Sequence, residues 1–175
     1  MSRAMRFAPL ILLLLLLAGL AWRLVTPADT HVSSKLLGKP IPAFALPPAV
    51  PSKPSVASTD LVTGAPKLLN IFASWCVPCV AESRVLIELR QRGVHVDGIA
   101  IRDRSEDVAS FLARNGDPYE RIGSDQQSRV QIALGSSGVP ESFVIDGKGV
   151  VRYQQIGPIE ESDMPLIMAK LAEAR

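Results

Sequence analysis

The chain has 175 residues, which is enough for one domain of ordinary size with a remainder at the N-terminus. The formal net charge is +2, and acidic and basic residues are mixed along the chain without a Lys/Arg cluster, so nothing suggests a nucleic-acid-binding surface. Only two cysteines occur, too few for a disulfide scaffold, and a closed zinc site is a poor interpretation because His31 lies in a linker-like segment.

The chain begins with a basic and then strongly apolar segment. Arg3 and Arg6 precede an apolar run over residues 7–22, which includes six consecutive leucines and ends at Trp22. This pattern is that of a signal peptide or of a retained anchor. The apolar core is longer than that of a usual signal peptide, so we expect a single transmembrane anchor over residues 1–25. In either case the basic flank predicts that the rest of the chain is exported.

Residues 26–37 form a polar stretch that we interpret as a tether to a folded domain over residues 38–175. The domain begins with a proline-rich part, residues 38–66, which predicts extended and turn-rich structure. A short strand is expected at residues 43–46, at an edge where proline is tolerated.

From residue 68 onward, apolar runs alternate with amphipathic segments. Residues 68–73 are a short apolar run typical of a buried strand, and a helix is expected from Cys76 to about Gln91. The side chains expected on the core face of this helix are Val80, Val85, Leu86 and Leu89.

The remaining elements continue the alternation and close with a hairpin and a helix. In chain order they are a strand over residues 94–101, a helix over 105–114 with Ser105 as its N-cap, a weak strand at 119–122, a short helix at 126–134, two hairpin strands at 142–145 and 150–155, and a helix from about Glu160 to the end. This order predicts an α/β fold with a central mixed sheet flanked by helices.

The two cysteines lie where the buried strand ends and the next helix begins, in the order Cys76, Val77, Pro78, Cys79. The first N–H groups of a helix are unpaired and its dipole is positive there, so a thiolate is stabilised and the thiol pKa falls. We therefore expect Cys76 to be the attacking nucleophile. Cys79, one turn deeper and less exposed, would resolve the mixed disulfide.

Several residues near this motif have more than one interpretation. A structural disulfide across two residues would constrain the unfolded chain very little, whereas a thiolate pair also suits Cu(I). Trp75 would shape the surface beside the nucleophile or simply pack on its loop. A cis bond between Val139 and Pro140 would leave the Val139 backbone free to pair with an extended substrate, although a trans proline at a strand start is ordinary. Trp75, Val139 and Pro140 are thus the expected substrate contacts, and no metal site is assigned.

These motifs resemble the thioredoxin superfamily and, more closely, the DsbE/CcmG family of membrane-anchored thioredoxin-like proteins used in cytochrome c maturation. The resemblance covers about residues 38–175, and the N-terminal segment is similar as well. It is carried by residues 37–44 (LGKPIPAF), 68–76 (LLNIFASWC), 112–119 (LARNGDPY) and 138–146 (GVPESFVID).

The resemblance implies roles for five residues. Cys76 and Cys79 match the family's redox pair, and Pro140 matches its cis-proline. Glu82, one turn beyond Cys79, and Glu141, next to Pro140, match acidic residues around the family's active site, where a carboxylate raises the pKa of a buried thiol and takes its proton. Without the resemblance, Glu82 would be interpreted as a first-turn acid that serves the helix dipole. No cofactor is implied beyond the redox-active disulfide Cys76–Cys79.

Two positions depart from the general patterns. Residue 70 is Asn, as in the cytochrome-maturation branch, where thioredoxins have an aspartate. An amide cannot shuttle a proton, so proton transfer would rest on Glu82, Glu141 or water. The loop before Pro140 reads Leu-Gly-Ser-Ser at residues 134–137, where the family has aromatic residues, and this leaves the exact substrate open.

The resemblance implies a thiol:disulfide oxidoreductase held in the cytoplasmic membrane, with its redox domain in the periplasm. Its expected partners are a membrane electron donor of the disulfide-transporter type, and apocytochrome c or a thiol protein of haem attachment, whose disulfide it would reduce. A disulfide-donating oxidase and, among non-enzymes, a Cu(I)-binding chaperone remain as alternatives, because sequence position does not fix the direction of electron flow.

Overall fold

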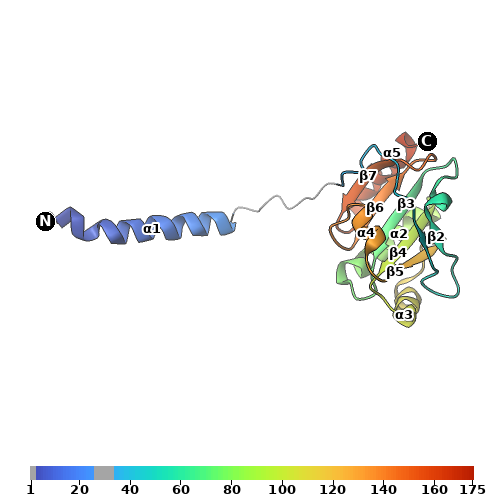
Figure 1. Cartoon of the computed structure of the whole chain (residues 1–175), viewed down its shortest axis with the longest axis horizontal. Helices are drawn as coiled ribbons and strands as arrows, with labels where there is room; N and C mark the ends of the chain where they lie inside the picture. The colour runs from blue at the N-terminus through green and yellow to red at the C-terminus, as the bar shows by residue number, and fades with distance from the viewer. Residues whose placement is uncertain (1–2, 26–33) are drawn as a thin grey trace. The chain divides into compact units, whose positions relative to one another are not determined.

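The computed structural model describes residues 3–25 and 34–175, which belong to two units, Met1–His31 and Val32–Arg175. The first unit contains the helix α1 (Arg3–Val25), which includes the apolar run (Figure 1). In these described residues, no helix meets the length and apolarity needed to cross a membrane. Most of the expected tether lies outside the described residues.

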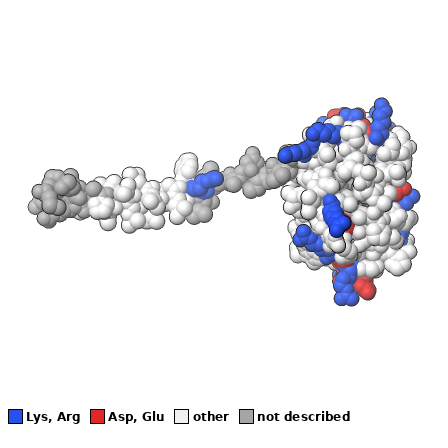
Figure 2. Space-filling view, in the orientation of Figure 1, with Lys and Arg blue, Asp and Glu red and all other residues white. Residues whose placement is uncertain are grey.

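The end of the expected tether belongs to the folded domain. The Ser34 hydroxyl donates to the carbonyl of Leu134 at 2.6 Å, and the Ser34 N–H donates to Oε1 of Gln154 at 2.6 Å. The domain therefore begins before residue 38. In Figure 2 the visible face of the domain carries scattered basic side chains with a few acidic ones between them.

A five-stranded mixed sheet forms the centre of the domain (Figure 1). Its strands are β3 (Lys67–Phe72), β4 (Val96–Ile101), β5 (Ile122–Asp125), β6 (Glu141–Ile145) and β7 (Val151–Ile156). They lie in the order β5-β4-β3-β6-β7, with β3, β4 and β5 parallel and with β6 antiparallel to both β3 and β7. The predicted mixed sheet is confirmed. Every residue of the central strand β3 is buried, which explains its continuous apolar run.

Helices cover one face of this sheet. They are α2 (Val77–Gln91), α3 (Ser105–Asn115) and α5 (Met164–Glu173), while α4 (Arg129–Ala133) is a short helix after β5. Alternate residues of a strand share a face, so Asn70 and Phe72 of β3 point to the same side. There Asn70 bonds Glu82 of α2, and Phe72 packs on Phe111 of α3 with ring centroids 5.6 Å apart. The segment that leads into α5 reaches this side too, because the N–H of Ile159 donates to Glu82.

The opposite face is covered by the proline-rich N-terminal part. Its elements are β1 (Ala45–Leu46), β2 (Val56–Ala57) and the 3-10 helix η1 (Ser58–Leu61), with β1 and β2 paired antiparallel. This hairpin lies so close to β5 that a Cβ at Gly123 would come within 2.9 Å of the side chain of Leu46. Glycine at this position therefore permits the close packing of the hairpin on the sheet.

Several expected boundaries shift for local reasons. Cys76 is the N-cap of α2, and the N-cap of α3 is Arg104 instead of Ser105, which is the first helical residue. The expected strand at 119–122 lies at 122–125, because Tyr119 is buried and stacks on Phe72. Val80 was expected in the core but is 44% exposed, since it lies beside the buried face of α2. The last helix is shorter than expected and follows the 3-10 helix η2 (Glu161–Asp163).

Candidate active site

The two cysteines form a disulfide at the junction of β3 and α2. The Sγ of Cys76, at the N-cap, accepts a hydrogen bond from the backbone N–H of Cys79 at 3.2 Å. Pro78 occupies the first turn of the helix, where its missing N–H is not needed. The N–H of Cys79 and the positive end of the α2 dipole stabilise a negative charge on Cys76 once the pair is reduced. Cys76 is therefore placed as the thiolate nucleophile.

Exposure does not distinguish the two sulfurs in the oxidised protein. Cys76 is 4% exposed and Cys79 is 3% exposed, so the expected difference in exposure is absent. The residues around them are open, since Trp75 is 57% exposed and Val77 is 80% exposed. The indole N–H of Trp75 donates to the carbonyl of Arg102 at 3.3 Å, so this exposed side chain is bound to the segment after β4.

Glu82 lies one turn beyond Cys79 and is almost completely buried, at 1% exposure. Its carboxylate accepts hydrogen bonds from Nδ2 of Asn70 at 3.3 and 3.4 Å and from the N–H of Ile159 at 3.3 Å. Burial raises the pKa of Glu82 to about 7, against the opposing effect of these hydrogen bonds. A carboxyl group on the same side of α2 as Cys79, with a pKa near neutrality, can take the proton of that thiol.

Asn70 connects Glu82 to a wider buried network. Its Nδ2 also donates to the hydroxyl of Ser142 at 2.9 Å, and its Oδ1 accepts from the hydroxyl of Tyr119 at 2.8 Å. Burial and the nearby carboxylates raise the pKa of Tyr119 well above 10, so this phenol stays protonated and acts as the donor. Sequence reasoning missed Tyr119 and Ser142, because they meet Asn70 only through the folding of the sheet.

Glu141 is also buried but lies on the other face of the sheet. Glu141 and Ser142 are neighbours on β6, so their side chains point to opposite faces, and Ser142 is the one that joins Asn70 and Glu82. The Glu141 carboxylate accepts from the Ser136 hydroxyl at 2.8 Å, from the Ser137 N–H at 2.9 Å and from the amide of Gln154. It holds the loop before Pro140, and it does not form one acidic cluster with Glu82.

That loop ends in the expected cis bond. The Val139–Pro140 peptide is cis, as the resemblance implies, with Val139 half-buried and Pro140 buried. The loop carries serines at positions 136 and 137, and the Ser136 hydroxyl and the Ser137 N–H both donate to Glu141. In this chain the loop is therefore fixed by hydrogen bonds to Glu141.

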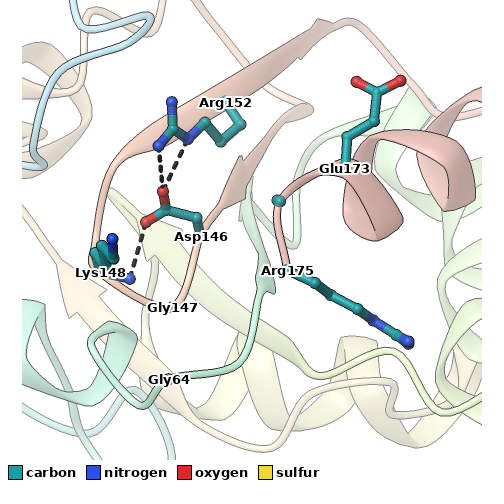
Figure 3. A pocket seen from close by; sticks show the side chains of 8 residues that line it. Gly64, Asp146, Gly147, Lys148, Arg152, Glu173 and Arg175 are labelled. Atoms are coloured by element: carbon teal, nitrogen blue, oxygen red, sulfur yellow. Dashed lines mark hydrogen bonds and ion pairs between the residues drawn. The ribbon is translucent and has the colours of Figure 1, made fainter.

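A separate cavity of about 460 Å³ lies at the turn between β6 and β7 (Figure 3). Asp146 points into the turn, where its carboxylate accepts from the N–H of Lys148 at 2.9 Å and from Nε of Arg152 at 2.8 Å. These bonds serve the hairpin, and none of the predicted site residues lines this cavity. Within residues 3–25 and 34–175, no group of three or more His, Cys, Asp or Glu side chains is arranged to hold a metal ion.

Comparison with known proteins agrees with this site. Residues 36–168 match the Redoxin family model. The chain is 37% identical to the thiol:disulfide interchange protein DsbE of Tatumella citrea, with 91% of this chain and 88% of that protein covered. It is 35% identical to the protein of the same name from Escherichia coli (strain K12), with 95% of each covered.

The fold agrees as well. A crystal structure of a thiol:disulfide interchange protein of the thioredoxin family from Chlorobium tepidum TLS superposes with a TM-score of 0.61 at 24% identity, over 84% of this chain and 99% of that one. The predicted thioredoxin-like α/β fold is confirmed. The chain belongs to the DsbE family of thiol:disulfide interchange proteins, and it is a thiol:disulfide oxidoreductase built around Cys76 and Cys79.

Proposed function

We propose that the protein reduces disulfides in apocytochrome c, or in a thiol protein of haem attachment, during cytochrome c maturation. The observation that carries the reductive direction is Glu82, buried one turn beyond Cys79. A buried carboxylate disfavours a thiolate at Cys79, so the reduced pair is not strongly stabilised, and a weakly stabilised dithiol is the better reductant. The substrate class is supported by the motifs shared with the cytochrome-maturation branch.

The exchange begins with both cysteines reduced. The Cys76 thiolate attacks one sulfur of the substrate disulfide, and the other substrate sulfur leaves as a thiolate. Cys79 then passes its proton to Glu82 and attacks Cys76, so that the bond between Cys76 and the substrate breaks. The substrate gains two electrons and becomes a dithiol after protonation, while the protein is left with the Cys76–Cys79 disulfide. In this proposal the cysteine pair itself carries the electrons, and no other cofactor takes part.

The oxidised protein is then returned to the dithiol by a membrane electron donor of the disulfide-transporter type. In this proposal residues 1–25 hold the chain in the cytoplasmic membrane and place the domain in the periplasm. The support is the basic flank before the long apolar run of the sequence. Cell fractionation with a C-terminal tag tests the location. A soluble periplasmic product that lacks the residues before Trp22 would show a cleaved signal peptide and would contradict anchoring.

Trapping with Cys79→Ser tests the function. This variant lacks the resolving sulfur, so the mixed disulfide on Cys76 should accumulate. We expect the trapped partner to be a c-type apocytochrome or a haem-attachment thiol protein, released by dithiothreitol. Cys76→Ser is the matched control, because it keeps one thiol but loses the nucleophile. Equal trapping by both variants, or a trapped set without such partners, would contradict the proposal.

Two further measurements separate the alternatives. In an oxidase, the reduced form of the cysteine pair is stabilised, so its reduction potential is higher than that of glutathione. Equilibration of the protein with reduced and oxidised glutathione would measure this potential directly. A Cu(I) chaperone would bind copper tightly in its reduced form and lose binding when both thiols are blocked. We expect the protein to be more reducing than glutathione and its disulfide exchange to proceed in the presence of a copper chelator.

A further inference from the structure

A polar groove of about 450 Å³ lies directly beside the nucleophile loop. Trp75, the residue before Cys76, contributes to its lining together with residues after β4 and on α3. The basic members of the lining are Arg102, Arg104 and Arg114, all of which are exposed. Figure 2 shows both basic and acidic side chains at the end of the domain that carries α3. Neither the disulfide nor Glu82 lines this groove.

Hydrogen bonds attach the groove to the nucleophile loop. Asp103, at 5% exposure, accepts from the N–H of Ser74 at 2.5 Å and from the Ser74 hydroxyl at 2.7 Å. The indole N–H of Trp75 donates to the carbonyl of Arg102. A segment bound in the groove is therefore held at a fixed position relative to Cys76.

The lining of the groove has a small excess of positive charge, with three arginines against two aspartates. The Asp103 carboxylate accepts hydrogen bonds from Ser74, which is neutral and does not cancel the carboxylate charge. Across the described residues, neither Arg102 nor Arg114 has an ion-pair partner. Arg104 lies 3.5 Å from Glu106, but both side chains are about three-quarters exposed, and such a pair contributes little. Asp107 is the other acidic residue of the lining.

Arg102 is fixed at the groove by its backbone as well. Its φ of 47° is left-handed, a conformation that side chains with a Cβ rarely adopt. It is maintained by a bond from the Arg102 N–H to the carbonyl of Asp125 at 3.2 Å and by one from Nε to the Ser128 hydroxyl at 2.9 Å. Backbone held in this way is frequent at binding sites.

We propose that this groove docks an acidic segment of the substrate polypeptide, next to the disulfide that Cys76 attacks. The proposal rests on the proposed function as a reductase of protein disulfides. Charge complementarity defines the occupant, because guanidinium groups pair with the carboxylates of Asp and Glu side chains. Because the groove lies beside Trp75, the docked segment and the cysteine that Cys76 attacks can belong to the same substrate chain. Docking there selects acidic substrates and speeds their encounter with the protein.

Binding tests the groove independently of the redox chemistry. The probe is a fluorescein-labelled, cysteine-free peptide rich in aspartate, compared with the same peptide carrying asparagine, and the protein is the oxidised full-length chain in detergent. At low salt we expect the acidic peptide to bind about tenfold more tightly than the neutral one. The double variant Arg104→Gln/Arg114→Gln should lose this preference. Its matched control, Arg90→Gln/Arg92→Gln at the C-terminal end of α2, should keep it.

Reduction rates of disulfide peptides with the same acidic or neutral flanks give the second readout. The wild type should reduce the acidic peptide faster, and the Arg104/Arg114 double variant should reduce both at the neutral rate. Equal binding of the two peptides by the wild type, or a preference that survives in the double variant, overturns the docking proposal. Failure to reduce either peptide while the acidic preference in binding persists contradicts the proposed function and supports the groove.

Discussion

The side-chain amide of Asn70 donates to both carboxylate oxygens of Glu82, at 3.3 and 3.4 Å, across 12 positions of sequence and from strand to helix. The amide stabilises the ionised carboxylate, whereas burial stabilises the neutral acid, and burial is the larger effect. The resulting pKa of about 7 leaves Glu82 close to half ionised at neutral pH. Such a group can accept a proton from Cys79 and release it again within one reaction cycle.

Tyr119→Phe should raise the pKa of Glu82 further. The Tyr119 hydroxyl keeps Oδ1 of Asn70 turned away from Glu82, and without it the amide can turn its oxygen toward the carboxyl group, which favours the protonated form. We expect the pKa of Glu82 to rise by about 0.5 or more, which a carbon NMR titration of its carboxyl group would measure. Tyr153→Phe, whose hydroxyl bonds Gln155, is the matched control. A similar shift in both variants would contradict this role for Tyr119.

The stability of the oxidised protein should fall as pH rises through the titration of Glu82. The pKa is 4.5 in the unfolded chain and about 7 in the folded one, so the folded state binds more protons between these values. The contribution of Glu82 to the free energy of unfolding is therefore fully present below pH 4.5 and is lost progressively up to about pH 7. The loss is about 3 kcal/mol for a fully buried group.

Glu82→Gln should remove this part of the pH dependence. Urea unfolding at pH 5 and pH 8 would measure it as the difference between wild type and variant, which cancels the other titrating groups. Glu161→Gln is the control, because the Glu161 side chain is 73% exposed. If Glu82→Gln keeps the same loss of stability between the two pH values as the wild type, the assignment of the pKa to Glu82 is wrong.

The sequence predicts much of this site, but not how its carboxylates are divided. The buried strand before Cys76, the helix after it and the later hairpin are local patterns, and the structure has all of them. The face on which Glu141 lies depends on the pairing of β6 with β3, which no local pattern reveals. The contact of Tyr119 with Asn70 joins residues 49 positions apart and likewise requires the assembled sheet.

Glu141→Gln should destabilise the loop at residues 134–138 without changing the pH dependence of thiol reactivity. Both carboxylate oxygens of Glu141 accept hydrogen bonds. In the variant, the Gln NH₂ group would replace one of these oxygens and would face a hydrogen-bond donor. A loss of about 1–3 kcal/mol is expected in urea unfolding. The alkylation rate of the reduced protein, followed against pH, should keep its wild-type profile, whereas Glu82→Gln should shift it. A shifted profile in Glu141→Gln would place this carboxylate in proton transfer after all.

The roles of the two cysteines are tested most directly by finding which sulfur reacts first. The fully reduced protein is treated with a limiting amount of iodoacetamide near neutral pH, and the labelled cysteine is identified by mass spectrometry. Cys76 lies at the N-cap of α2, where the helix stabilises a thiolate, and Cys79 lies one helical turn from buried Glu82, whose carboxylate disfavours one. We predict that Cys76 carries nearly all of the label. Preferential labelling of Cys79 would contradict this prediction.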